Sequence, residues 1–286
     1  MDGDRSEGAS PFFLPGRAGN LFALYHRPAG PAGCRGGVLY VHPFANEMNH
    51  TRRAAALLAR ALAGHGWGVL QVDLFGCGDS DGDFRDASWK TWIDDLTIAF
   101  DWLEERVGGP VGLVGIRLGG LLALDFASRA RRDIDRVLLW HPVVNGQQMM
   151  TEFLRLRLLS DAMGVRAGES ATTTQELRQK INSGEPVEVV GYELMPHLSQ
   201  AIAEIRIAQL GLAVATPIRW VEVVSGAEDP GRPLAQTTVH GWQAAGREAT
   251  LHLVAGRPFW SSPRIHDSRD PTDIVVRIFG ENHDAA

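Results

Sequence analysis

Short apolar runs alternate with stretches of helical spacing along most of the chain. Runs with the length and apolar composition of strands buried within a sheet occupy residues 37–42, 67–74, 110–115, 134–141, 217–224 and 250–254. Apolar residues recur three or four positions apart, as on one face of a helix, over residues 51–63, 88–106, 118–129 and 272–279. Two further strands are expected at 12–13 and 21–25. This alternation predicts a mostly parallel sheet with helices on both faces.

The alternation is interrupted once, between about Asn145 and Ala213, where the pattern is mainly helical. A helical insertion before the last two strands and the last helix is the element order of the α/β-hydrolase fold. We therefore expect one α/β-hydrolase domain over residues 11–286, with a helical lid at about 145–213, after a flexible N-terminus at residues 1–10. The strand at 110–115 should be central, and the lid should lie above the carboxyl ends of the strands.

The most specific motif is a glycine frame at the turn from the strand at 110–115 into the next helix. Nucleophilic serines of α/β-hydrolases stand in G-x-S-x-G at such a turn, where the strained, tightly packed backbone requires glycine. Here the frame reads Gly115-Ile116-Arg117-Leu118-Gly119, with Arg117 in place of the serine. A guanidinium is not deprotonated in proteins and is no nucleophile. The sequence therefore predicts a nucleophile elbow without its usual chemistry.

A second match to the same pattern lies at residues 78–82, around Ser80. It belongs to a long acidic turn after the strand at 67–74, and no helix follows it directly. A sharp strand-to-helix elbow cannot form there, so Ser80 is not interpreted as a nucleophile.

In α/β-hydrolases the acid and the base of the catalytic triad also occupy characteristic positions after particular strands. The acid normally follows the next-to-last strand, where Glu228 or Asp229 fits. The base should be a histidine after the last strand, but Pro258 occupies that position, and His266 further on is interpreted as a loop histidine. Since nucleophile and base are both missing, a normal serine-triad mechanism is not expected.

Residues at the carboxyl ends of the strands form the candidate binding site, because ligands of open parallel sheets bind there. The candidate ligand-binding residues are His42, Phe44, Cys77, Arg117, Leu118, His141, Glu228 and Asp229. The loop after His42 should supply one amide of an oxyanion hole, and Leu118 the other. A cation beside free amides at a helix N-terminus predicts an anion site. The alternative is an internal ion pair of Arg117 with Asp229 or Glu228, because a buried arginine needs a partner.

Composition and charge exclude several kinds of partner. The net charge is −6 and no basic block exists, so no nucleic-acid partner is expected. No run approaches the roughly 18 apolar residues of a membrane span. The histidines and the two cysteines, Cys34 and Cys77, have no metal-ligand spacing, and no cofactor is expected. Two free thiols and the lack of an apolar leader favour the cytoplasm.

Six segments indicate a particular family of proteins far more specifically than the glycine frame alone. They are HPFANEMNHTRR (42–53), DLFGCGDSDGDF (73–84), GIRLGG (115–120), WHPVVNGQQMMTEFLRLRL (140–158), VEVVGYEL (187–194) and PFW (258–260). Over roughly residues 10–280 the chain resembles the exosortase A system-associated hydrolase 2 family, a branch of the α/β-hydrolases. The resemblance implies a cytoplasmic bacterial protein linked to exopolysaccharide synthesis and PEP-CTERM protein sorting, and implies that Arg117 is a family trait. The word hydrolase in that name comes from fold analogy, which says little about activity.

Three interpretations follow from these residues. The leading one is a pseudoenzyme that binds a small anionic or acylated molecule in its pocket. The second is an active esterase, thioesterase or acyltransferase that uses Cys77, or a water held by His42 or Asp229. The third is a scaffold whose lid docks another protein. An open pocket with an unpaired Arg117 would favour the first, a Cys77–histidine hydrogen bond the second, and a filled pocket under an exposed apolar lid the third.

Overall fold

The computed structural model describes residues 8–29, 33–130, 132–164, 173–212, 216–261 and 269–280. Its centre is an eight-stranded sheet in the order β1-β2-β4-β3-β5-β6-β9-β10. These strands are β1 (Ala9–Pro15), β2 (Asn20–His26), β3 (Gly36–Val41), β4 (Trp67–Val72), β5 (Val111–Ile116), β6 (Val137–Trp140), β9 (Ile218–Val224) and β10 (Ala249–Ala255). From β4 to β10 all neighbours are parallel, and β1 and β2 add an antiparallel edge. The predicted mostly parallel sheet with a central strand at 110–115 is confirmed.

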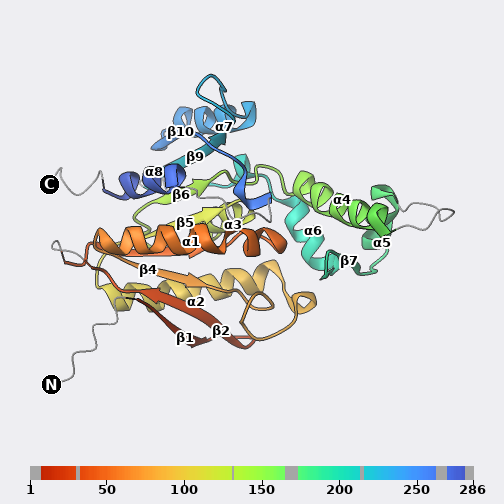
Figure 1. Ribbon diagram of the computed structural model, residues 1–286, viewed down its shortest axis with the longest axis horizontal. Coiled ribbons are helices and arrows are strands. Elements are labelled where there is room, and N and C mark those ends of the chain that lie inside the picture. Colours follow the sequence, from red (N-terminus) through yellow and green to blue (C-terminus); the bar gives the residue numbers. More distant parts are fainter. Residues whose placement is uncertain are drawn as a thin grey trace.

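Helices cover both faces of the sheet (Figure 1). One face carries α1 (Asn46–Gly64) and α8 (Arg269–Gly280), which contact each other. The other face carries α2 (Trp89–Val107), α3 (Leu118–Arg129) and α7 (Pro233–Ala244). Both cores draw on the same strands because side chains alternate along a strand. In β5, for example, Leu113 joins the α2–α3 core and Val114 the α1–α8 core, and both side chains are fully buried. This two-sided burial explains why the strands are almost entirely apolar.

The N-terminal strand begins earlier than the sequence pattern indicated. Ala9 and Ser10, expected within a flexible N-terminus, pair with His26 and Tyr25 of β2. Backbone pairing does not require an apolar side chain, so a polar strand end is invisible to a hydrophobic pattern. Residues 1–7 lie outside the described part of the chain.

Between β6 and β9 the chain leaves the sheet. This part contains α4 (Gly146–Gly164), α5 (Thr174–Asn182), β7 (Val187–Val189), β8 (Tyr192–Leu194), α6 (Pro196–Glu204) and the short helix η2 (Ile207–Gln209). We call residues 146–204 the α4–α6 segment; it extends beyond one end of the sheet (Figure 1). Phe153 of α4 packs edge-on against Phe44, just after β3, with 4.9 Å between ring centroids. The segment therefore lies over loops at the carboxyl ends of the strands.

The hairpin of β7 and β8 was not foreseen, since the pattern there indicated mainly helix. Val190 and Gly191 form its turn, and both have positive φ, at 44° and 87°. Such two-residue turns favour Asn-Gly or Asp-Gly, and valine is a rare choice at positive φ, so the usual hairpin signal is missing. None of the helices in the described ranges combines the length and apolar composition of a bilayer-spanning segment.

Candidate functional site

Arg117 occupies the sharp turn between β5 and α3. Its backbone has φ 55° and ψ −121°, a conformation that residues other than glycine rarely adopt. The flanking glycines are required by close packing. A Cβ on Gly115 would lie 2.4 Å from the carbonyl oxygen of Gly119, and a Cβ on Gly119 would lie 2.3 Å from that of His42. The glycine frame predicted to be the nucleophile elbow therefore forms a sharp strand-to-helix turn around an arginine.

The partner of Arg117 is Glu47, in the first turn of α1. Arg117 Nε donates a hydrogen bond to Glu47 Oε1 over 3.1 Å, and each side chain is 12% exposed. The predicted pairing of Arg117 with Asp229 or Glu228 is wrong. Helices α1 and α3 each follow a strand after a short turn, and those strands, β3 and β5, are neighbours, so the first turns of the two helices lie side by side. Burial raises the pKa of the Glu47 carboxyl, and the charge of Arg117 opposes this rise.

Asp229, at the acid position, closes its own turn. Its carboxylate accepts hydrogen bonds from Ser225 Oγ at 2.7 Å, from the Ser225 amide at 3.0 Å and from the Gly231 amide at 2.9 Å. The hydroxyl and amides of this turn lower the pKa of Asp229, with the Ser225 hydroxyl contributing most. Glu228 is exposed on the same turn. Both carboxylates are thus occupied locally or in solvent rather than directed at the elbow.

Trp260, two residues after the predicted base position Pro258, packs against Arg117. Pro258 is exposed, whereas Trp260 is buried. The indole packs 4.5 Å from the His141 ring, and the guanidinium carbon of Arg117 lies 5.3 Å from its centroid. His266 lies outside the described residues. An aromatic ring therefore stacks on Arg117 at the end of the turn from β5 into α3.

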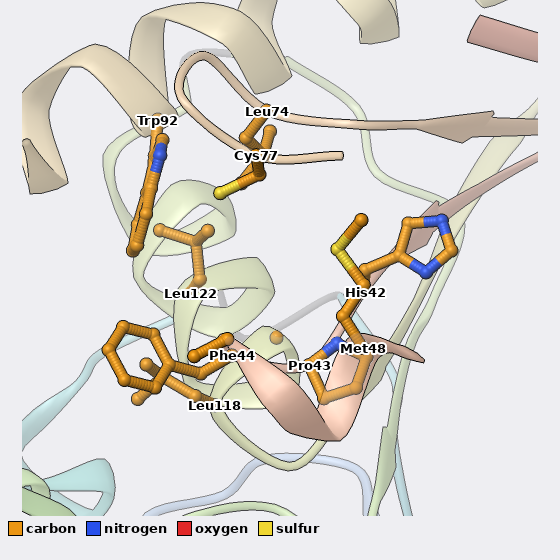
Figure 2. A pocket seen from close by; sticks show the side chains of 11 residues that line it. His42, Pro43, Phe44, Met48, Leu74, Cys77, Trp92, Leu118 and Leu122 are labelled. Atoms are coloured by element: carbon orange, nitrogen blue, oxygen red, sulfur yellow. The ribbon is translucent and has the colours of Figure 1, made fainter. Parts of the chain in front are cut away.

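A small pocket lies beside the elbow, beneath the loop after β3 (Figure 2). His42, Phe44, Cys77 and Leu118 are among its lining residues, and its volume of about 20 Å³ is enough for one water molecule. The Cys77 sulfur points into the pocket, and the His42 ring points away from it (Figure 2). Burial, together with the nearby carboxylates of Asp73 and Asp95, raises the pKa of Cys77 to about 12. The thiol therefore stays protonated at neutral pH, which argues against a cysteine nucleophile.

His42 lies beside the ion pair of Asp73 with Arg52. Its Nε2 is 3.8 Å from Asp73 Oδ1, and Asp73 is held by Arg52 Nη2 at 2.9 Å. Burial lowers the pKa of His42 to about 4, although Asp73 opposes the shift. Ser80 is part of the same support: its Oγ donates to the Asp73 carbonyl at 2.5 Å and accepts from the Phe22 amide at 2.8 Å. Ser80 thus ties its turn to the sheet edge.

A buried cluster follows β6 and β9. His141 Nδ1 accepts a hydrogen bond from the Val223 amide at 3.2 Å, which assigns the ring proton to Nε2. Burial lowers the pKa of His141 to about 2, and the positive charges of Arg232 and Arg117 lower it further. His141 is therefore a neutral hydrogen-bond donor throughout the physiological pH range.

Glu222 and Arg232 form the ion pair of this cluster. Glu222 is fully buried in β9 and accepts from Trp220 Nε1 at 2.9 Å and from Arg232 Nη2 at 2.8 Å. Arg232 Nε also donates to Glu222, and its Nη2 donates to the Pro142 carbonyl at 3.1 Å. Sequence reasoning did not identify either residue. The available signal was a single carboxylate within the apolar run at the carboxyl end of β9.

Two cavities meet at Arg117. The Arg232 cavity, of about 240 Å³, is lined by Arg117, His141, Val143, Val144, Asn145, Gln148, Met149, Glu152 and Arg232. The Trp260 cavity, of about 200 Å³, is lined by Asn46, Glu47, Arg117, Met149, Glu152, Phe153, Leu156, Trp260 and Ser261. Arg117, Met149 and Glu152 border both, so the cavities adjoin between the elbow and α4. The Asn145 side chain accepts a hydrogen bond from the Gln148 amide at 3.1 Å and so caps the N-terminus of α4, the helix that borders both cavities.

The structure separates the predicted site residues into three places. His42, Phe44, Cys77 and Leu118 line the small pocket, Arg117 and His141 line the Arg232 cavity, and Glu228, Asp229 and Pro258 lie outside these pockets. Within the described ranges no group of three potential metal ligands occurs.

Replacing His141 by asparagine should make folding less sensitive to acid. The folded pKa of about 2 lies below the usual histidine value, so below about pH 6.5 the unfolded chain binds a proton that the folded protein does not. Stability is therefore lost as the pH falls, by about 1.4 kcal/mol per pH unit, or on the order of 2 kcal/mol from about pH 6 to about pH 4.5. Asparagine tolerates the positive φ of 43° at this position. Urea unfolding at both pH values measures the difference, and equal acid losses in the two proteins would contradict a buried, neutral His141.

Comparison with known proteins relates this architecture to hydrolases. The family described as serine aminopeptidase, S33, matches residues 34–214. The ferulic acid complex of Est1E from Butyrivibrio proteoclasticus is similar in structure, with a TM-score of 0.69, 18% identity and coverage of 94% of this chain and 98% of that one. A thermostable carboxyl esterase from Bacillus coagulans in complex with glycerol gives a TM-score of 0.63 at 14% identity, with 95% and 96% covered.

DcsB in complex with its substrate analogue has the same TM-score of 0.63 at 14% identity, and the match covers 96% of this chain and 99% of that one. A comparison with curated proteins gives no match. At these identities the structural likeness shows the fold alone, and the predicted α/β-hydrolase fold is confirmed.

Proposed function

Since this chain belongs to the serine aminopeptidase, S33, family of α/β-hydrolases, we propose that it uses the family's site to bind a small anionic or acyl ligand, without serine-triad catalysis. One observation carries the proposal. Where catalysis would need a serine and a histidine, an arginine and a tryptophan stack on each other beside two open cavities. The elbow backbone keeps its strained conformation, although no nucleophile stands there.

The Arg232 cavity supports ligand binding because its polar groups are mainly hydrogen-bond donors. Arg117 and Arg232 are donors only, and the neutral His141 donates through Nε2. A ligand oxygen, in an anion or in an acyl group, is the complementary partner. Arg117 is paired, so the expectation of a free arginine is not met, but its ion pair uses Nε, and Arg117 also lines the Arg232 cavity.

Hydrolysis by another group is the second candidate, and family membership favours it. The solved relatives include Est1E with ferulic acid bound and a carboxyl esterase, and both names point to ester chemistry in those proteins. In this chain the raised pKa of Cys77 and the local bonding of Asp229 offer no activated nucleophile. Binding without triad catalysis is therefore the better-supported proposal.

Several finer parts of the proposal rest on the sequence. The resemblance to the exosortase A system-associated hydrolase 2 family would place the protein in the cytoplasm of a bacterium that makes exopolysaccharide. The α4–α6 segment would serve as a lid over the two cavities and could also receive a protein partner.

The unaltered protein should not turn over p-nitrophenyl acetate or butyrate above background, and fluorophosphonate probes should not label it. The Arg117→Ser variant should behave in the same way, because Trp260 and Pro258 leave no general base to activate the new hydroxyl. Initial rates and mass spectrometry of the probe-treated protein measure both. Robust ester hydrolysis by Arg117→Ser would refute the claim that the site lacks a general base. Labelling of Ser80 in the unaltered protein would overturn the proposal in favour of the second candidate.

Binding itself is tested by thermal shift against a panel of carboxylates, phosphate esters and acyl-CoA. A ligand that binds the folded state raises the midpoint of unfolding with concentration. A panel without any concentration-dependent shift would contradict the proposed function.

A further inference from the structure

The two cavities that adjoin at Arg117 have different chemistry. Three of the residues that line the Arg232 cavity carry nitrogen donors, namely Arg117, Arg232 and His141. In the Trp260 cavity, four apolar side chains provide much of the wall, namely Met149, Phe153, Leu156 and Trp260. From this division we propose that the ligand is an amphiphilic monocarboxylate, with its carboxylate in the Arg232 cavity and a short acyl or aryl tail in the Trp260 cavity. This inference rests on the proposed function and names its ligand class.

The donors of the Arg232 cavity are partly used and partly left for a ligand. Arg232 donates hydrogen bonds through Nε to Glu222 and through Nη2 to Glu222 and the Pro142 carbonyl. Arg117 donates through Nε to Glu47. The remaining Nη groups and His141 Nε2 can converge on a small oxygen group. A carboxylate presents two oxygens with about four acceptor sites and matches such a donor set.

The charge balance favours a singly charged head over a multiply charged one. Both guanidinium groups already have a carboxylate partner, Glu47 or Glu222. A further carboxylate, Glu152, stands at the exposed mouth and accepts from Gln148 Nε2 at 2.8 Å. A dianionic phosphate would meet these negative charges without a matching excess of positive charge, whereas a monocarboxylate gains donors at a smaller repulsive cost.

The path between the cavities runs past side chains that border both of them. Arg117 forms one side, and Met149 and Glu152 of α4 form the other. A carboxylate bound beside Arg117 would therefore direct its chain along α4 toward Phe153 and Leu156. Each methylene buried there should tighten binding about fourfold.

Isothermal titration calorimetry with butanoate, octanoate and octanamide tests the proposal on the full chain. Octanoate should bind on the order of 100-fold more tightly than butanoate, because its tail reaches the Trp260 cavity. It should bind at least about tenfold more tightly than octanamide, which has the same chain without the charge. The variant Leu156→Gln should remove most of the preference for octanoate over butanoate. Leu159→Gln is the matched control, since Leu159 lies on the same helix, is 58% exposed and lines neither cavity.

The possible failures are distinguishable. If butanoate and octanoate bind equally, the tail assignment is wrong, but anion binding stands. If octanoate and octanamide bind equally, the head assignment is wrong, but acyl binding stands. If only octyl phosphate, added as a fourth probe, binds, the carboxylate class is overturned and the anion site remains. If none of the four binds, both this inference and its ligand class fail, and the thermal-shift panel decides the proposed function independently.

Discussion

Replacing Arg232 by alanine should lower the free energy of unfolding by about 3–5 kcal/mol, because it leaves a buried carboxylate without its ion partner. Glu222 is fully buried in β9, and Arg232 supplies two of its hydrogen bonds. The remaining neutral donor, Trp220 Nε1, cannot balance the charge. Urea unfolding at neutral pH measures the loss.

The double variant Glu222→Gln/Arg232→Ala separates the stranded charge from lost packing. Glutamine still accepts from Trp220 but carries no charge, so the double variant should recover much of the stability lost in the single one. Arg85→Ala is the surface control, because Arg85 and Glu193 are 3.1 Å apart with side chains 51% and 38% exposed, and such pairs contribute about 1 kcal/mol or less. If Arg232→Ala costs no more than Arg85→Ala, Glu222 is not a buried charge.

Replacing Arg117 by alanine should have the second-largest effect, on both stability and binding. The variant leaves Glu47 largely buried without its partner, and we expect a loss of about 3 kcal/mol or more. It should also abolish stabilisation by octanoate, since Arg117 borders both cavities. Urea unfolding with and without octanoate measures the two effects together.

The Glu47→Gln/Arg117→Ala variant distinguishes a structural arginine from a ligand-binding one. Removing the stranded charge should restore much of the apo stability, while stabilisation by octanoate should remain absent. A restored octanoate effect in this double variant would show that Arg117 only holds Glu47 in place. A stable Arg117→Ala variant that still responds to octanoate would contradict both roles.

Local patterns determined the fold and the elbow. Buried strands of a parallel sheet must be apolar on both faces, so their positions can be read from short apolar runs, as for β3, β4 and β5. The elbow could be recognised because Gly115 and Gly119 pack against backbone at distances that exclude a Cβ, and this requirement is local. From these features alone the sequence predicted a sharp strand-to-helix turn with Arg117 at its centre.

The partners in the site were decided only by the tertiary structure. Glu47 and Arg117 are 70 positions apart, and they meet because β3 and β5 are neighbours and each strand is followed, after a short turn, by a helix. Trp260 reaches Arg117 from the short helix that follows β10, and Glu222 meets Arg232 across a loop. Residue types state which groups need partners, but burial and strand order decide which partner is within reach. A buried charge pairs with an oppositely charged group that the fold places within hydrogen-bonding distance, and the spacing of the residues in the sequence does not indicate which group that is.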